Sequence, residues 1–434
     1  MLLVYSHKIT SRLIYIFKHV FKTMLEVPID FTSNIEVFVA HSGPKISYTF
    51  KPLGKEFFIE AQTLLFEQGI EEIPITVEKW EGIPCFFKST DASNLPYDIF
   101  AAAFYLITRY EEALLHLKDN IGRYSPAQSL AYRNDFLSLP VIDHWMSQLH
   151  KILKAYFSDF PTTNNDRPLW QPLFDIALPY RYLQRSFFAA ISDFIYALSR
   201  FQIFKLYNQV VVLLHLKKDP YDNYDHLERL FKHYTWQPHF FILYAENTPF
   251  ESTTSIYNSL YQSLIKGLSD FAKVSLMLSY DAQRSKLYLQ KDKNNLNNLT
   301  HRTIRSVRMH RGLIDIQKIY SHLVEEEIST DFSMGYPETI GYRAGTSVPF
   351  HYYDLDNELQ LPLVLYPVVA SSSALRKSSA SKAFAELRKL YENLPLSTAC
   401  HSVAFSNEIL NKDTYNMLWA DQFINYLKWH AKQK

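Results

Sequence analysis

Charged residues form two local clusters whose residue types could do chemistry. Glu325, Glu326 and Glu327 bring three carboxylates together, a set that suits metal binding or acid–base catalysis. A second cluster spaces basic side chains three residues apart, which suits an anionic ligand: Arg302, Arg305, Arg308 and Arg311. Runs of like charge usually face solvent, so we expect a solvated helix end at the first cluster and a solvated, partly ion-paired face at the second.

Several familiar sites are absent from the sequence. It contains no GxGxxG motif, no phosphate-binding loop and no GxSxG elbow. Its two cysteines, Cys85 and Cys400, exclude a disulfide framework, and no CxxC pair indicates structural zinc.

The composition is typical of a globular protein with large cores. The 434 residues include 45 basic and 44 acidic side chains, and the net charge of +1 gives no overall attraction to nucleic acid or to an anionic membrane. Aromatic residues are abundant, with 30 Tyr, 31 Phe and 6 Trp. Such side chains also stack on sugars, but most of these lie in apolar runs, which is more typical of a core.

Neither a secretory signal nor a membrane span is expected. His7, Lys8 and Arg12 follow the short apolar start, and no small-residue cleavage site is present. No run of about 18 uncharged apolar residues occurs. We therefore expect a cytoplasmic protein.

The length predicts two or three domains, and the elements that would position a site fall into two groups. In the first group we expect strands at 2–5, 36–40 and 46–50. We expect helices that begin at Thr10 or Ser11, run from Pro96 to Leu115, and cover 142–157. The polar segment 158–168 has a proline near each end and is the best linker. This pattern predicts an N-terminal α+β domain over residues 1–160.

Strands and helices alternate over residues 168–434. We expect strands at 169–176, 239–244, 274–278, 363–369 and 397–400. We expect helices around 187–204 and at 222–233, 256–271, 315–324 and 379–392. This order is typical of a parallel α/β barrel or a doubly wound sheet. Barrels of this kind place their working residues at the carboxyl ends of the strands.

Eight short strings form a recognisable series along the chain. In the first domain they are residues 95–98, 101–106, 109–112, 122–124 and 129–132. In the second they are residues 218–222, 334–336 and 341–346. Each string alone is weak, but together, in this order and along nearly the whole chain, they resemble landmarks of bacterial polysaccharide deacetylases, in the group with an additional N-terminal α/β domain.

The resemblance implies a distorted (β/α) barrel that removes N-acetyl groups from a glycan. In that family an aspartate and two histidines hold a zinc-like metal, which lowers the pKa of its bound water from about 15.7 to about 7. A second aspartate acts as the base, an arginine positions that base, and a late histidine protonates the leaving amine.

Matched position by position, the metal ligands are missing. Asp175 stands where the family has its base, and Ala177 stands where it has the metal-binding aspartate. Met277 occupies the first histidine position, and no histidine occurs between His239 and His301. A methyl group has no lone pair, and a thioether is a poor ligand for zinc-like ions.

Other family positions retain polar residues. Arg343 matches the arginine that positions the base, and His401 matches the late histidine. His310 matches a position of unassigned role, and Ser372 replaces a further acidic residue. Asp281 is a weak candidate for cation binding and is more typical of an exposed loop carboxylate.

These substitutions predict a pseudoenzyme. Full ligand sets of structural zinc are worth about 10–16 kcal/mol, and losing at least two of three ligands forfeits most of a comparable amount. We expect no cofactor, and a cleft that binds a glycan, a partner from cell-envelope biosynthesis, or nothing. The alternative is an active metal-dependent N-deacetylase with a rearranged site built from Asp281, His310 and His401. In a third hypothesis only the N-terminal domain binds a partner.

Overall fold

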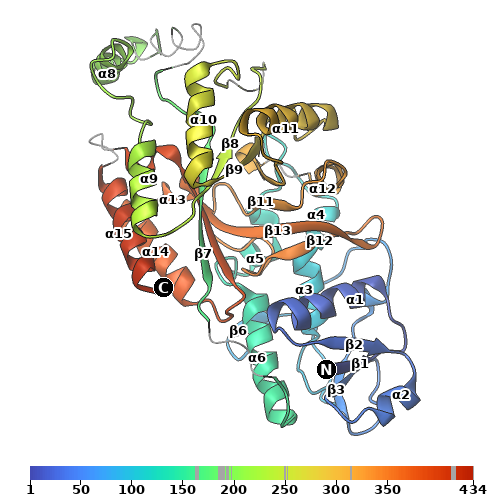
Figure 1. The fold of residues 1–434 in the computed structure, drawn as a ribbon. Coiled ribbons are helices and arrows are strands. Elements are labelled where there is room, and N and C mark those ends of the chain that lie inside the picture. The colour runs from blue at the N-terminus through green and yellow to red at the C-terminus, as the bar shows by residue number, and fades with distance from the viewer. Residues whose placement is uncertain are drawn as a thin grey trace.

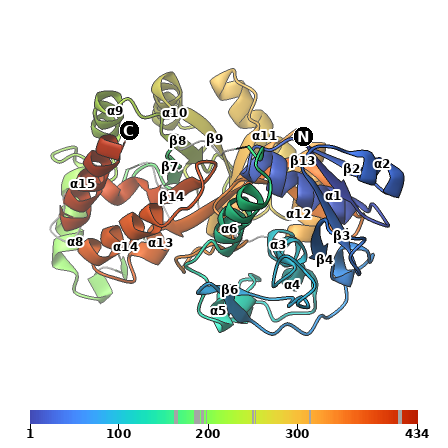
Figure 2. The same cartoon turned by 90° about the horizontal axis from the view of Figure 1, so that it is seen from below.

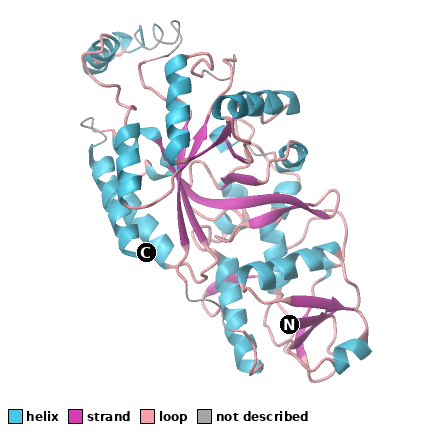
Figure 3. Ribbon diagram, viewed as in Figure 1, coloured by secondary structure: helices cyan, strands magenta, loops and turns pink. Residues whose placement is uncertain are grey.

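In a computed structural model, the described residues are 1–161, 166–183, 191, 195–196, 198–248, 251, 253–312, 315–411 and 417–433. Figure 1 shows a small N-terminal α/β region beside a larger barrel, and Figure 3 shows the strands of the two parts as separate groups. Among the described residues no helix is long and apolar enough to cross a bilayer.

The N-terminal region is built on a parallel four-stranded sheet in the order β2-β1-β3-β4. Its strands are β1 (Leu2–Tyr5), β2 (Ile29–Thr32), β3 (Lys45–Thr49) and β4 (Phe57–Glu60). A two-stranded hairpin is formed by β5 (Glu78–Trp80) and β6 (Ile83–Cys85). The helices are α1 (Ser11–Phe17), α2 (Ile35–Ala40), α3 (Ile99–Ile107), α4 (Tyr110–Ala113), α5 (Leu130–Arg133) and α6 (Val141–Tyr156).

Side-chain caps explain where these helices begin. Thr10 caps α1 as predicted, because its side chain accepts a hydrogen bond from the Leu13 N–H at 3.1 Å. The strand predicted at 36–40 is wrong, and this segment is helix α2. The Asn34 side chain accepts hydrogen bonds from the N–H groups of Glu36 and Val37, and this cap outweighs the strand preference of the valines.

Seven parallel strands close into a barrel, which confirms the predicted fold class. The order is β11-β10-β9-β8-β7-β14-β13, and β11 pairs in turn with β13. An eighth strand, β12 (Phe350–Asp354), is antiparallel to β13. The barrel strands are β7 (Leu169–Ile176), β8 (His239–Ile242), β9 (Lys273–Leu278), β10 (Ser306–Met309), β11 (Thr330–Met334), β13 (Leu359–Ser371) and β14 (Cys400–Ser406).

Helices surround this barrel, and a cluster of apolar side chains is buried within it. They are α8 (Ile203–Leu213), α9 (Tyr224–His233), α10 (Ser259–Phe271), α11 (Lys286–Thr300), α12 (Ile316–Glu325), α13 (Ser372–Leu375), α14 (Ala380–Glu392) and α15 (Met417–Gln433). Figure 2 shows α14 and α15 on the flank away from the N-terminal sheet. The buried apolar side chains of this cluster are Leu173, Phe241, Leu243, Met277, Phe332, Val368 and Ala404. The helix predicted around 187–204 lies largely outside the described residues.

The two regions share one hydrophobic core, to which α3 and α6 contribute beside strands of the barrel. Polar contacts also join them, since the Asp143 carboxylate of α6 accepts hydrogen bonds from the side chains of Thr346 and Ser347. The domain limits at residues 160 and 168 stay a prediction, and residues 162–165 of that linker lie outside the described part. The barrel strand β7 begins at Leu169, one residue after the predicted linker.

Candidate functional site

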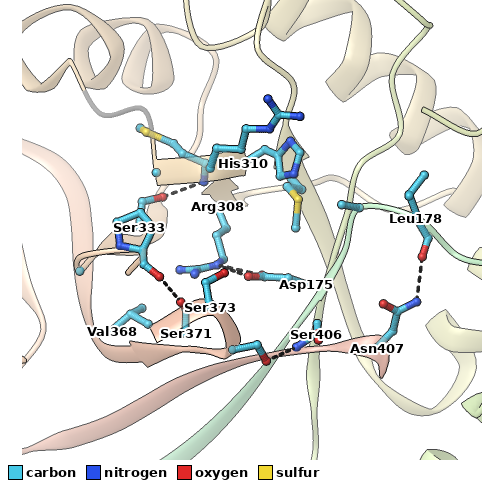
Figure 4. A pocket seen from close by; sticks show the side chains of 18 of the residues that line it. Asp175, Leu178, Arg308, His310, Ser333, Val368, Ser371, Ser373, Ser406 and Asn407 are labelled. Carbon is cyan, nitrogen blue, oxygen red and sulfur yellow. Dashed lines mark hydrogen bonds and ion pairs between the residues drawn. The ribbon is translucent and has the colours of Figure 1, made fainter. Parts of the chain in front are cut away.

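A cavity of about 320 Å³ opens where the barrel strands end (Figure 4). Its walls come from the carboxyl ends of β7, β9, β10, β11, β13 and β14 and from the segments that follow them. This is the end at which barrels of this kind place their working residues. Asp175, Ala177 and Met277, which the sequence predicted to lie together, all line it.

Asp175 forms an ion pair with Arg308 in this cavity. The Arg308 Nε lies 2.8 Å from Asp175 Oδ1 and 3.1 Å from Oδ2, and another guanidinium nitrogen donates to the Phe332 carbonyl. The expectation that Arg308 belongs to a solvated surface cluster is therefore wrong. Arg308 lies in strand β10, which the sequence did not reveal, and its side chain is 11% exposed.

Arg343 does not position Asp175, so that prediction is wrong. Its guanidinium binds Glu112 through two nitrogens, at 2.9 and 2.5 Å, and also donates to the Gly335 carbonyl. Glu112 belongs to the N-terminal region, and Arg343 is buried. The arginine that contacts Asp175 is Arg308.

His401 lies near the opposite end of the barrel from the cavity. The strand was predicted to end at Cys400, but β14 begins there, and His401 pairs in register with Trp170 whereas Asp175 pairs with Ser406. Five residues of strand separate the two positions by about 16 Å. His401 is fully buried beside the Tyr426 hydroxyl at 3.0 Å, and burial lowers its pKa to about 3. Its predicted place beside Asp175 is wrong.

His310 lines the cavity and is held by the carboxylate of Glu251, which no sequence pattern singles out. Its Nδ1 pairs with an oxygen of Glu251, whose other oxygen accepts a hydrogen bond from the Tyr280 N–H at 2.8 Å. Burial raises the pKa of Glu251, but these hydrogen bonds and the charge of His310 outweigh it, and the pKa is lowered. Asp281 starts a turn after β9 and is not a lining residue of this cavity.

Hydroxyl and amide groups form the side of the cavity opposite His310 (Figure 4). The Ser406 N–H donates to Ser372 Oγ at 2.8 Å, and Asn407 Nδ2 donates to the Leu178 carbonyl at 2.8 Å. Ser371 Oγ donates to the Pro337 carbonyl. The hydroxyl of Ser372, which the resemblance matched to an acidic position, thus holds the backbone of strand β14.

The donor set does not fit a zinc-like ion. At the two cavity positions that the resemblance matched to metal ligands stand a methyl group, Ala177, and a buried thioether, Met277, which packs among apolar side chains of the barrel interior. Within the described ranges, no group of three His, Cys, Asp or Glu residues is arranged to hold a metal. Asp281, His310 and His401, the three residues of the alternative metal site, do not lie together. Of the three, only His310 lines the cavity.

Gly335 is required by close packing at the cavity wall. A Cβ at this position would lie 2.2 Å from the Val368 carbonyl oxygen, which is backbone and cannot rotate away. We expect Gly335→Ala to lower the free energy of unfolding by about 1–3 kcal/mol. Chemical denaturation measures this change.

Gly267 provides the matched control for that substitution. It is exposed in helix α10, and a Cβ there would have no neighbour within 4 Å. Because alanine is the better helix former, Gly267→Ala is expected to raise the free energy of unfolding by about 0.5–1 kcal/mol. Equal effects of the two substitutions would contradict the packing argument.

Comparisons with known proteins agree with the fold. Residues 2–158 match the model of a family of unknown function, DUF7033. No curated protein matches the chain. The barrel is similar to solved structures of CE4 polysaccharide deacetylases and their inactive relatives.

Three of these solved structures illustrate the degree of likeness. An assigned polysaccharide deacetylase from Mycobacterium smegmatis has a TM-score of 0.40 and 11% identity, over 62% of this chain and 87% of that one. BA3943, a CE4 family pseudoenzyme from Bacillus anthracis, has a TM-score of 0.32 and 8% identity, over 62% and 63%. The polysaccharide deacetylase Bc1974 from Bacillus cereus has a TM-score of 0.31 and 10% identity, over 61% and 89%. With such low identities, the fold of this chain is established by its own strand pairing.

Proposed function

We propose that this protein is a polysaccharide-deacetylase-like barrel that does not hydrolyse N-acetyl groups and uses its cavity to bind a polar ligand. The observation that supports this most strongly is the pair of residues at the family's ligand positions, Ala177 and Met277, which both line the cavity. Asp175, which we assign to the position of the family base, is paired with Arg308. Without a bound cation the pKa of water stays at about 15.7, and a carboxylate base cannot usefully deprotonate it.

The late histidine of the family reaction has no counterpart at the carboxyl end of β14. The carboxyl end of β14, where a late histidine would face Asp175, carries Ser406 and Asn407. Neither side chain protonates an amine near neutral pH. The replacement of the cation ligands and the displacement of the late histidine favour inactivity over the alternative of an N-deacetylase with a rearranged metal site.

A glycan is the ligand class that the cavity suits best. Its lining combines an ion pair with serine hydroxyls and an asparagine amide, and such groups form hydrogen bonds with sugar hydroxyls. Their number is small and their directions are fixed by the strand ends, as in other ligand pockets. We therefore propose a binding role in carbohydrate metabolism, and no metal is part of it.

Acetate release tests the inactivity. The purified chain is incubated with N-acetylated chito-oligosaccharides in the presence of added zinc, nickel, cobalt or manganese. We expect no acetate above the level of a reaction without protein, because the cation has no ligand set. Stoichiometric metal after purification without chelator, together with acetate release that is lost in Asp175→Asn, would show an active enzyme.

Calorimetric titration with the same oligosaccharides tests the binding. Ser373 is exposed at the cavity, and Ser373→Trp fills the space with an indole ring. We expect binding to the wild type and at least about a tenfold weaker affinity in Ser373→Trp. Ser381→Trp, on the exposed face of α14, is the matched control and should bind normally. Equal affinity in both variants would place the ligand elsewhere.

A further inference from the structure

A second cavity lies in the N-terminal region. Its volume is about 620 Å³, and its walls are residues of α3, α4 and α5 and their connections, together with the segment that precedes β5. A smaller cavity of about 190 Å³ lies against the same segment, because Glu72, Ile73 and Pro74 line both. We call the two together the N-terminal groove. Among the described residues, none that lines this groove also lines the cavity at the barrel.

One wall of the groove belongs to a segment, residues 72–77, whose side chains alternate in exposure. The half-buried ones pack on the hydrophobic core: Ile73, Ile75 and Val77. The exposed ones lie between them: Glu72, Pro74 and Thr76. A period of two is the pattern of an extended strand, and the segment runs without a turn into β5. It nevertheless pairs with no strand of the described structure.

The main chain of this segment carries unused hydrogen-bonding groups. Among the described residues, no N–H or C=O group of residues 72–77 forms a hydrogen bond. In an extended chain the groups of every second residue point to the same edge. Pro74 has no N–H, which interrupts the edge that it shares with the other exposed residues. The edge formed by the half-buried residues is complete, and an unpaired edge of this kind is a template for another strand.

Two tyrosine hydroxyls in the groove also lack a hydrogen-bond partner. Tyr105 and Tyr124 are each 6% exposed, so their rings are buried, and both line the larger cavity. Neither hydroxyl forms a hydrogen bond within the described part of the chain, and neither is sealed from solvent. The Glu111 carboxylate, which also lines this cavity, is occupied by Arg109 and by the Leu130 N–H, both at 2.7 Å. The two hydroxyls therefore remain available to a ligand.

Carboxylates dominate the charge of the groove. Its charged lining residues are Glu67, Glu71, Glu72, Glu111 and Arg133. Arg109 neutralises Glu111, whereas the other three glutamates are exposed and form no ion pair with a described residue. A ligand with basic side chains is therefore favoured.

We propose that the N-terminal groove binds an extended peptide with Lys or Arg side chains, which adds to residues 72–77 as a second strand. Main-chain hydrogen bonds supply the affinity of such complexes, and pockets for alternate side chains supply their specificity. The basic side chains of the peptide would meet Glu71 and Glu72. A second copy of this chain fits less well, because its own segment brings the same carboxylates. A sugar would leave the regular row of main-chain groups unpaired, so this site is independent of the glycan binding proposed for the barrel.

Selection from a displayed library of random linear peptides, with the full chain as bait, tests this proposal. Peptides of about nine residues are long enough to cover the segment at about 3.3 Å per residue. We expect the enriched sequences to alternate apolar residues with Lys or Arg. Fluorescence anisotropy of an enriched peptide then measures its affinity. Methylation of every second amide nitrogen of that peptide should abolish binding in one register and spare it in the other, because a strand pairs through alternate residues.

Two proline substitutions distinguish the two edges of the segment. Ile75→Pro removes an N–H from the complete edge and should weaken peptide binding about tenfold. Thr76→Pro is the matched control, because it removes an N–H from the edge that Pro74 already interrupts, and it should change the affinity by less than about twofold. Circular dichroism checks that both variants are folded.

Charge reversal gives a second comparison. Glu72→Lys should weaken binding of the basic peptide about fivefold at low salt and by less at high salt. Glu392→Lys changes an exposed glutamate at the end of α14 and should leave the affinity unchanged. Failure to enrich any peptide, equal effects of the two proline substitutions, or equal losses in the two methylation registers would overturn the proposal.

Discussion

Ala177→Asp combined with Met277→His is expected to give the barrel an affinity for zinc-like ions that the wild type lacks. Both positions line the same cavity as Asp175, so the new carboxylate and imidazole would face one space. These are the ligand types that such ions prefer, whereas a methyl group and a thioether are not. We expect the association constant for zinc to rise on the order of 100-fold. Calorimetry and metal analysis after chelator-free purification measure the change.

A control with the same chemistry separates the site from nonspecific binding. Met417 and Ala431 lie near the two ends of α15, so Met417→His with Ala431→Asp adds the same two groups far apart. This control should bind zinc no better than the wild type. Equal affinities of the two double variants would mean that Ala177 and Met277 do not correspond to ligand positions.

Metal binding alone is not expected to restore hydrolysis. No histidine stands at the carboxyl end of β14, because His401 lies at the beginning of that strand. The double variant should therefore bind the ion and still release no acetate from N-acetylated oligosaccharides. Acetate release by this variant would show that another group supplies the proton, and His310 is the one imidazole placed at the cavity among the described residues.

The sequence could predict the part of the site that depends on strand order alone. Strand β7 has the predicted bounds, and the family match on it assigned Asp175 and Ala177. The carboxyl ends of parallel strands meet at one end of a barrel, so Met277 on β9 was expected at the same place. Those three residues do line one cavity. Periodicity and a family motif were sufficient for this prediction, since neither depends on the conformations of the loops that connect the strands.

The remaining errors concern residues whose environment depends on tertiary contacts. His401 was misplaced because a strand boundary shifted by several residues, which moved the side chain from one end of the barrel toward the other. Arg308 was assigned to a surface because the short strand β10 has no clear pattern in a basic segment. Glu251 contacts His310, which is 59 residues away in the sequence, and a charge pair at that separation leaves no periodic signal.

Arg343 was assigned the wrong partner for a related reason. The sequence contains Arg109, Glu112 and Arg343 within strings that match the family, but the strings do not state which of their members are in contact. In the structure these side chains meet at the junction between the two regions. Their contacts can be tested through stability.

Glu112→Gln is expected to destabilise the whole protein strongly. The Glu112 carboxylate accepts hydrogen bonds from Arg109 Nε at 2.7 Å and from Arg343 Nε at 2.9 Å, and all three side chains are buried. Without the charge of Glu112, the buried guanidinium groups of Arg109 and Arg343 would have Glu111 as the one carboxylate still paired with either of them among the described contacts. Removing one partner of a buried ion pair costs about 3–5 kcal/mol, and chemical denaturation should show a loss of that size.

Glu228→Gln is the matched control for this substitution. Glu228 pairs with Lys232 on the surface of α9, so the same change of charge should cost no more than about 0.5 kcal/mol. A loss in Glu112→Gln as small as the loss in this control would show that the buried pair adds little to stability. The Arg343 guanidinium also holds the Gly335 carbonyl at the cavity wall, so Glu112→Gln should weaken ligand binding as well.

The pH dependence of unfolding distinguishes the charge of Glu112 from its shape. Burial alone would raise the pKa of Glu112, but the charges and hydrogen bonds of Arg343 and Arg109 outweigh burial and lower the pKa to about 2. A carboxyl group whose pKa is lowered on folding stabilises the native state above its ordinary pKa. That stabilisation, about 3 kcal/mol, disappears as the pH falls from about 4.5 to 2. In Glu112→Gln the acid loss of stability over this window should be smaller by about that amount. An unchanged pH profile would mean that Glu112 is not held as a carboxylate by the two arginines.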